Sequence, residues 1–127
     1  IIVLNTLYYY TKFCPYSTPA EKIQFCKPAD LSEDKIPDDP AGQFEWLTDQ
    51  LNTARNNGEK VYITSHIGPQ RGYGFTEQWH PKFMTKFYDL ILPFHNIVEA
   101  LIFGHTHADM FGLLERPGTE GDYPTKA

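Results

Sequence analysis

The sequence lacks both a long apolar run and a surplus of basic residues, and each absence argues against one class of protein. No apolar run approaches the roughly 20 residues that a membrane-spanning helix needs, and no positively charged start precedes an apolar signal core. The formal net charge is -5, and the eleven Lys and Arg residues are scattered along the chain. Because nucleic-acid-binding domains usually carry a basic face, we expect no such face here.

Cysteine is also scarce. Cys14 and Cys26 are the two cysteines, and both fall in a Pro-containing stretch, residues 8–39, that predicts a long irregular excursion. A disulfide between them would close this excursion, whereas in a cytosolic protein the same pair would be free thiols. The sequence leaves both alternatives open.

The start of the chain has no initiator Met and is strongly apolar, with Ile1, Ile2, Val3 and Leu4 in succession. Such a run is typical of a strand buried on both faces, which needs more neighbouring strands than a short chain supplies. At 127 residues, 41% of them hydrophobic, the chain can enclose one core and not two. We therefore expect residues 1–127 to be a piece of one longer domain.

A helix is predicted after Asp39, which would be its N-cap, with Pro40 at the first helical position and Asn57-Gly58 as the stop. Apolar residues then recur at spacings of three and four, which predicts one buried stripe: Phe44, Leu47, Leu51 and Ala54. We expect this stripe to pack on a sheet.

Two strands and a second helix follow. Residues 60–65, "KVYITS", alternate and are β-branched, as strands are. A helix is predicted from near Pro81 to Asn96, and residues 96–103, "NIVEALIF", predict the next strand. This alternation of strands and helices predicts an α/β fold.

Histidines follow both of these strands. His66 comes after the first and His105 after the second, and in open α/β sheets ligands bind beyond the carboxyl ends of the strands. A single histidine is more often only hydrogen-bonded or solvated, and we expect this of His80 and His95.

His105 and His107 form a pair within Gly104-His105-Thr106-His107. In an extended segment, side chains two residues apart share a face, and a small Gly104 would let the chain turn sharply as it leaves the sheet. Two neutral imidazoles on one face suit a metal such as zinc. The alternative is a loop whose histidines bind only backbone carbonyls.

These segments resemble a known family. Residues 104–109, "GHTHAD", are similar to the last metal-binding motif of calcineurin-like metallophosphoesterases, and residues 62–69, "YITSHIGP", to the single-histidine motif that precedes it. Residues 39–69 are similar to the corresponding helix and strand of acid sphingomyelinase and its phosphodiesterase relatives. The opening residues 1–10 resemble the strand after the family's Gly-Asn-His motif, so the resemblance extends to about Phe111.

The resemblance implies a fold, a cofactor and an activity. The fold would be the carboxyl-terminal part of a metallophosphoesterase β-sandwich flanked by helices, within one domain that includes residues 1–127. The cofactor would be a pair of zinc ions, with His66 and His105 as ligands of one ion and His107 as a ligand of its neighbour. The complete protein would be a phosphodiesterase.

The sequence also lacks three motifs that this family needs. No Asp-x-His, Gly-Asp-x-x-Asp or Gly-Asn-His is present, and in the family these supply the remaining ligands, the bridging carboxylate and the general acid. We therefore expect the general acid to lie upstream of this chain and the isolated chain to be inactive.

Substrate identity is weakly indicated. Residues 68–81, "GPQRGYGFTEQWHP", would lie beside the metals, and Arg71, Tyr73, Trp79 and His80 either line a pocket or belong to a solvated loop. Tyr73 and Trp79 are the predicted substrate-binding residues. Sphingomyelin, nucleotides and other phosphodiesters fit the resemblance, with membrane contact only if a lipid is the substrate. It further implies a secreted or lysosomal protein with Cys14 in a disulfide.

Two other functions are compatible with the same segments. One is an inactive member of the fold kept as a binding module. The other is a structural zinc site in a small domain, although Cys14 and Cys26 are twelve residues apart, not at the short spacing that such sites prefer.

Overall fold

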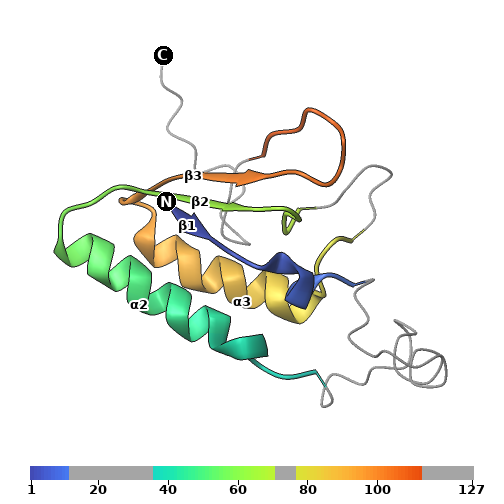
Figure 1. Ribbon diagram of the computed structural model, residues 1–127, viewed down its shortest axis with the longest axis horizontal. Helices are drawn as coiled ribbons and strands as arrows, with labels where there is room; N and C mark the ends of the chain where they lie inside the picture. The colour runs from blue at the N-terminus through green and yellow to red at the C-terminus, as the bar shows by residue number, and fades with distance from the viewer. Residues whose placement is uncertain (12–35, 71–76, 113–127) are drawn as a thin grey trace, which may run out of the picture.

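The computed structural model describes residues 1–11, 36–70 and 77–112, and these residues adopt an α/β fold (Figure 1). The strands are β1 (Ile2–Val3), β2 (Val61–Ser65) and β3 (Val98–Phe103). The α-helices are α2 (Gln43–Asn56) and α3 (Pro81–Ile91). Short 3-10 helices are η1 (Thr6–Tyr9), η3 (Pro40–Gly42) and η5 (Leu92–Phe94).

The sheet is parallel, with its strands in the order β1-β2-β3. In sequence, α2 lies between the first two strands and α3 between the last two. Because right-handed crossovers in one direction across a sheet place their helices on the same side, both helices cover one face of the sheet (Figure 1). All three strands therefore end at the same edge of the molecule.

The predicted stripe of α2 is confirmed, whereas the predicted helix start is confirmed only in part: Asp39 is the N-cap and Pro40 the first residue of the 3-10 helix η3, not of α2. All four residues of the stripe are buried: Phe44, Leu47, Leu51 and Ala54. The α-helix begins at Gln43, because Ala41 adopts a left-handed backbone with φ 58° that interrupts helical geometry after Pro40. Asp39 still acts on the helix start, since its carboxylate oxygens accept hydrogen bonds from the second and third helical amides at 2.8 and 2.9 Å.

The second helix also agrees with the sequence pattern. α3 buries Phe83, Phe87 and Ile91 and continues into η5, which ends two residues before the predicted Asn96. Neither α2 nor α3, nor any other helix among the described residues, is both long and apolar enough to cross a membrane.

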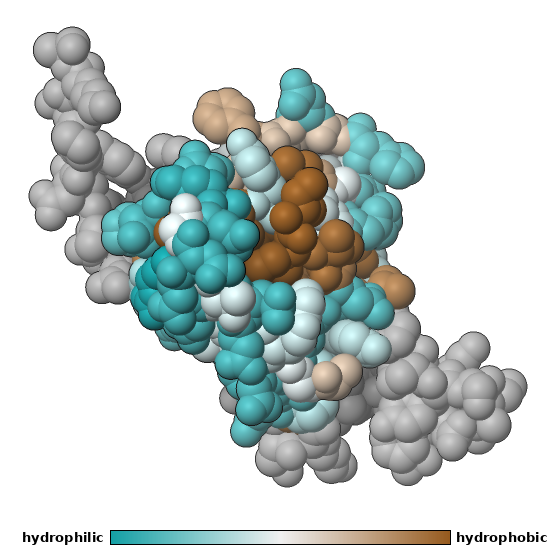
Figure 2. All heavy atoms as spheres, turned by 60° about the vertical axis from the view of Figure 1, so that its left-hand side comes forward, coloured by the Kyte–Doolittle hydropathy of each residue, from teal (hydrophilic) through white to brown (hydrophobic). Residues whose placement is uncertain are grey.

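Burial of the first strand on both faces is not observed. Ile2 is 9% exposed, but Val3 is 66% exposed, because the helices pack on only one face of the described sheet. Tyr62 (46%) and Ile102 (53%) are exposed on the same face as Val3, as the strand register requires. Figure 2, which shows one side of the molecule, has a continuous area of hydrophobic residues at the surface, coloured brown.

Candidate metal centre

The ends of β2 and β3 bring two of the predicted metal ligands together. Ser65 and Phe103 are partners in the parallel register, and one step further the backbone N–H of Gly104 donates to the carbonyl of His66 at 2.9 Å. This hydrogen bond extends the pairing beyond the last residues of the strands. His66 and His105 therefore lie side by side although 39 residues separate them in sequence.

The ring nitrogens of the two histidines converge. Nδ1 of His105 lies 3.3 Å from Nε2 of His66, and the ring centroids are 5.1 Å apart at an interplanar angle of 82°. Two ligand nitrogens that are each about 2.0–2.1 Å from a tetrahedral zinc ion lie roughly 3.3–3.4 Å apart. The separation therefore fits two ligands of one ion.

The backbone turns at the histidines themselves. His105 has φ 74° and His107 has φ 52°, whereas Gly104 is not in the left-handed region, and Thr106 N–H donates to the carbonyl of Gly104 at 2.9 Å. The prediction of an extended segment that turns at Gly104 is therefore wrong. Left-handed backbone at a residue with a side chain costs about 1–2 kcal/mol, and such strain is concentrated at functional sites.

His107 stands apart from the other two histidines. Its side chain is exposed, and within the described residues no group of three or more His, Cys, Asp or Glu side chains is arranged to hold a metal ion. The described part of the chain thus offers a pair of converging imidazoles and a separate third one. Metal ligation by His66, His105 and His107 stays a prediction.

A chain of hydroxyl groups fixes the backbone on both sides of His66. Ser65 Oγ donates to the carbonyl of Leu4 at 2.6 Å, so its lone pair is left to accept from Thr6 Oγ1, which lies 2.8 Å away. Thr6 Oγ1 in turn accepts from the backbone N–H of Ile67 at 3.0 Å. Thr6 is 1% exposed, and these buried and half-buried bonds tie the segment after β1 to the end of β2.

Trp79 does not have the role predicted from the sequence. Its side chain is 1% exposed, its indole N–H donates to the carbonyl of Ile67 at 3.0 Å, and its ring packs on Tyr9 and Phe87. A side chain so completely enclosed presents no surface to a substrate. Trp79 instead stabilises the segment after His66 through its hydrogen bond to Ile67. Tyr73, Arg71, Cys14 and Cys26 lie outside the described residues.

The two histidines expected to be structural have ordinary hydrogen bonds. His80 is the N-cap of α3, where its Nδ1 accepts from the backbone N–H of Lys82 at 3.3 Å. Nδ1 of His95 lies 3.1 Å from the carbonyl oxygen of Leu92. Both predictions are confirmed.

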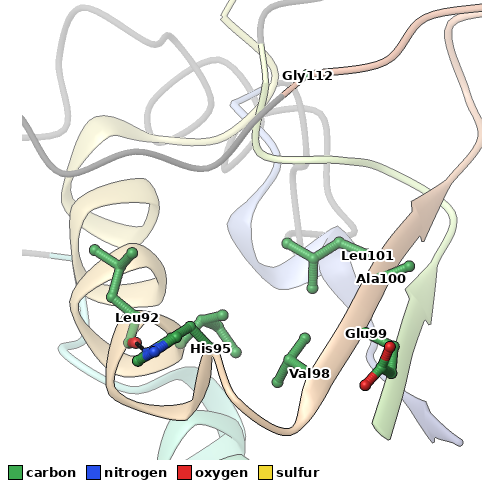
Figure 3. A pocket seen from close by; sticks show the side chains of 8 residues that line it. Leu92, His95, Val98, Glu99, Ala100, Leu101 and Gly112 are labelled. Carbon is green, nitrogen blue, oxygen red and sulfur yellow. Dashed lines mark hydrogen bonds between the residues drawn. The ribbon is translucent and has the colours of Figure 1, made fainter. Parts of the chain in front are cut away.

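A separate hollow of about 340 Å³ lies between the end of α3 and β3. Figure 3 shows Leu92 and His95 on the helical side, facing Val98 and Leu101 of the strand. Its ionisable groups are already engaged, His95 with a backbone carbonyl and Glu99 in an ion pair with Lys60 at 2.8 Å. The strand-end histidines are therefore the better candidate for chemistry.

Several known proteins have sequences similar to this chain. The chain is 32% identical over 120 residues to human acid sphingomyelinase-like phosphodiesterase 3b, a match that covers 90% of the chain. It is 37% identical over 73 residues to human sphingomyelin phosphodiesterase, covering 58% of the chain. A bovine cyclic GMP-AMP phosphodiesterase is 36% identical over 81 residues, covering 60%.

The chain is related to the acid sphingomyelinase family of phosphodiesterases. The resemblance predicted from the motifs is thereby confirmed. The matched part is 22% of the human 3b protein, 17% of the bovine protein and 10% of human sphingomyelin phosphodiesterase, so the chain spans a small part of these relatives. No family model matches the chain.

Tyr10 and Thr6 are the site residues that sequence reasoning missed in this acid sphingomyelinase relative. Tyr10 follows η1, and its hydroxyl oxygen lies 3.3 Å from Nε2 of His105. The sequence contains the run Tyr8-Tyr9-Tyr10, but three successive tyrosines do not tell which one reaches the site. Burial distinguishes Tyr9 from Tyr8 and Tyr10, because Tyr9 is 1% exposed. This burial raises the pKa of Tyr9 to about 12, although a hydrogen bond from Gln43 lowers it.

Proposed function

We propose that this chain supplies three ligands to the dimetal centre of a zinc-type phosphodiesterase. His66 and His105 would hold one ion, and His107 would hold its neighbour. The observation that carries the proposal is the 3.3 Å approach of two imidazole nitrogens at the ends of adjacent parallel strands. Kinship with named sphingomyelin and cyclic GMP-AMP phosphodiesterases supports it.

The donor set suits such a centre. Neutral imidazoles are common zinc ligands, and the 3.3 Å separation fits two of them on one ion. When bound, a pair of divalent ions provides Lewis-acid stabilisation of the phosphoryl charge and activates a water molecule. The remaining ligands, including a carboxylate that bridges the ions, and the general acid would come from parts of the protein outside residues 1–127.

The residues of this chain would contribute orientation rather than proton transfer. Paired strand ends hold the backbones of His66 and His105 together through the hydrogen bond between Gly104 and His66. Thr6 and Ser65 restrain the residues on either side of His66. Ligands that are held in place before the metal binds lose less conformational freedom on binding, which favours a tight site.

The proposal includes a β-sandwich. One face of the sheet packs on α2 and α3, while the other carries exposed apolar side chains: Val3, Tyr62 and Ile102. A parallel sheet is usually covered on both faces. A second sheet of the same domain, formed by residues outside this chain, would cover the exposed face and complete the sandwich.

The substrate would be a phosphodiester. The relatives are named for sphingomyelin and for cyclic GMP-AMP, which share a phosphodiester group and little else. A substrate of either kind would therefore meet the histidines through its phosphate. Secretion or a lysosomal location, and a disulfide at Cys14, stay predictions, since both cysteines lie outside the described residues.

The test uses the full-length protein with His66→Ala and His105→Ala, assayed with bis(p-nitrophenyl) phosphate. Each variant should lose at least about 100-fold in turnover together with the same metal ion, because each removes a direct ligand. His95→Ala is the matched control, because that histidine is exposed and its ring nitrogen lies near only a backbone carbonyl.

Metal analysis separates the proposal from its rivals. A wild-type protein with no bound metal and no turnover would identify a binding module instead of an enzyme. A single ion held without turnover would identify a structural zinc site. Unchanged metal content and turnover in both variants would overturn the proposal.

A further inference from the structure

The side chain of Tyr10 contacts the candidate metal centre, although Tyr10 is not one of its proposed ligands. Its hydroxyl oxygen lies 3.3 Å from Nε2 of His105, and the two rings meet edge to face with centroids 5.1 Å apart at 78°. The contact joins residues 95 positions apart in sequence. The contact is made by Nε2 of His105, the ring nitrogen that does not face His66.

The core of the domain holds Tyr10 in this position. Tyr10 forms an isolated β-bridge with Trp79, and the neighbouring backbone hydrogen bonds connect Thr11 to Gln78 at 3.0 Å and His80 to Tyr9 at 2.8 Å. Tyr9 is itself buried and stacks on Phe44 with a centroid distance of 4.7 Å. The backbone at Tyr10 is therefore held by its pairing with residues 78–80 and by the buried side chain of Tyr9 next to it.

The contact with Tyr10 bears on which nitrogen of the His105 imidazole carries the proton. A neutral imidazole carries one N–H, and the nitrogen that binds a metal must carry none. In His105, Nδ1 faces Nε2 of His66 while Nε2 faces the phenol oxygen. A ligand role for Nδ1 thus requires the proton on Nε2, where a hydrogen-bond acceptor stabilises it.

We propose that Tyr10 is a positioning residue for the metal centre, whose phenol oxygen accepts the Nε2–H of His105 and so leaves Nδ1 free to bind metal. The inference rests on the proposed function and adds a residue outside the ligand set. Tyr10 acts in two ways: it selects the tautomer of His105, and its ring limits rotation of the imidazole through the edge-to-face contact. Partners of this kind typically contribute about 10–100-fold to metal affinity.

The experiment compares Tyr10→Phe with Tyr8→Phe in the full-length protein. Phe keeps the ring of Tyr10 and removes only the acceptor oxygen. Tyr8 is the matched control because it is a tyrosine only two residues away whose side chain is exposed. Zinc affinity is measured by competition with a chelator, and the tautomer of His105 is read in metal-free, 15N-labelled protein from long-range nitrogen–proton correlations, with His105→Ala assigning the signals.

Tyr10→Phe should weaken binding of one zinc ion by about 10-fold or more and shift His105 away from the Nε2–H tautomer. Tyr8→Phe should change neither quantity. A residue that only packs in the fold would alter the melting temperature but would leave the tautomer unchanged, so the tautomer signal separates positioning from packing.

Two possible results distinguish a failure of the role of Tyr10 from a failure of the proposed function. If His105→Ala lowers zinc content while Tyr10→Phe leaves both the tautomer and the affinity unchanged, the inference about Tyr10 is overturned and the proposed function stands. If His105→Ala leaves zinc content unchanged, the proposed function fails, and the role of Tyr10 fails with it.

Discussion

The hydroxyl oxygen of Thr6 lies 2.8 Å from that of Ser65, and the two residues are 59 positions apart in sequence. The bond has a direction, because Ser65 Oγ donates to the carbonyl of Leu4 and must accept from Thr6. Thr6 also accepts from the backbone N–H of Ile67. The residues before and after His66 are thus both bonded to the segment that follows β1, which connects the stability of this interior to the position of a proposed ligand.

The first prediction is that Thr6→Val lowers stability and metal affinity together. The change keeps the shape of the side chain and leaves the buried N–H of Ile67 and the half-buried hydroxyl of Ser65 each without one partner, which costs about 1–3 kcal/mol. Urea unfolding measures this loss, and chelator competition measures the affinity. Thr53→Val, which removes a hydroxyl on the exposed face of α2, should stay within about 0.5 kcal/mol of wild type. Equal stability of the two variants would contradict the prediction.

The second prediction separates His107 from the histidine pair. Because His107 does not join His66 and His105 in one group of potential ligands, His107→Ala should deplete the second ion and lower the metal content from about two ions to about one per full-length chain. A double variant, His105→Ala with His107→Ala, should then retain little metal. Elemental analysis after dialysis measures both, and loss of the same ion in His105→Ala and His107→Ala would be inconsistent with two separate positions.

The third prediction concerns alkaline pH. Burial raises the pKa of Tyr9 from 10.0 to about 12, so the unfolded chain releases this proton at a lower pH than the folded protein does. The stability contributed by keeping Tyr9 neutral is complete below pH 10 and is lost as the pH rises toward 12, at most about 2–3 kcal/mol.

Urea unfolding of metal-free protein between about pH 9 and about pH 12 would measure this loss. Tyr9→Phe should show a smaller decrease than wild type, whereas Tyr8→Phe, which alters an exposed tyrosine, should follow wild type. Parallel pH profiles for Tyr9→Phe and wild type would show that the buried phenol is not the cause.

The fourth prediction tests the second sheet. Ile102 is 53% exposed on the open face of the described sheet, and Trp46 is 44% exposed on α2. If a second sheet covers Ile102 in the full-length protein, Ile102→Lys would bury an unpaired charge and destabilise the fold by about 2–4 kcal/mol. Trp46→Lys should cost much less, because the outer face of a helix stays in water. Similar melting temperatures for the two variants would count against the sandwich.

Part of this structure follows from local sequence patterns. The stripe on α2 and a strand at residues 60–65, which the structure has at Val61–Ser65, were predicted because helices and strands repeat their side-chain directions every 3.6 and 2 residues. The strand-end positions of His66 and His105 were predicted for a related reason, since the carboxyl ends of parallel strands meet at one edge of the sheet. Each of these predictions needs only the order of residues along one element.

Other features were decided by contacts between distant segments. Trp79 was predicted to line a substrate pocket, and it is buried because Tyr9 and Phe87 enclose it. Tyr10 reaches His105 across 95 residues, and no periodicity within either segment indicates that contact. Likewise, Val3 is exposed because the helices pack on only one face of the sheet.

The sequence by itself therefore determined the elements, their apolar faces and the edge at which the histidines gather. The tertiary structure decided which nitrogen of His105 faces His66, which tyrosine contacts the opposite side of that ring, and where the backbone turns. The physical reason is that periodicity reports the direction of side chains along one element. Hydrogen bonds and ring contacts at a site depend on how separate elements pack, and packing is a property of the whole fold.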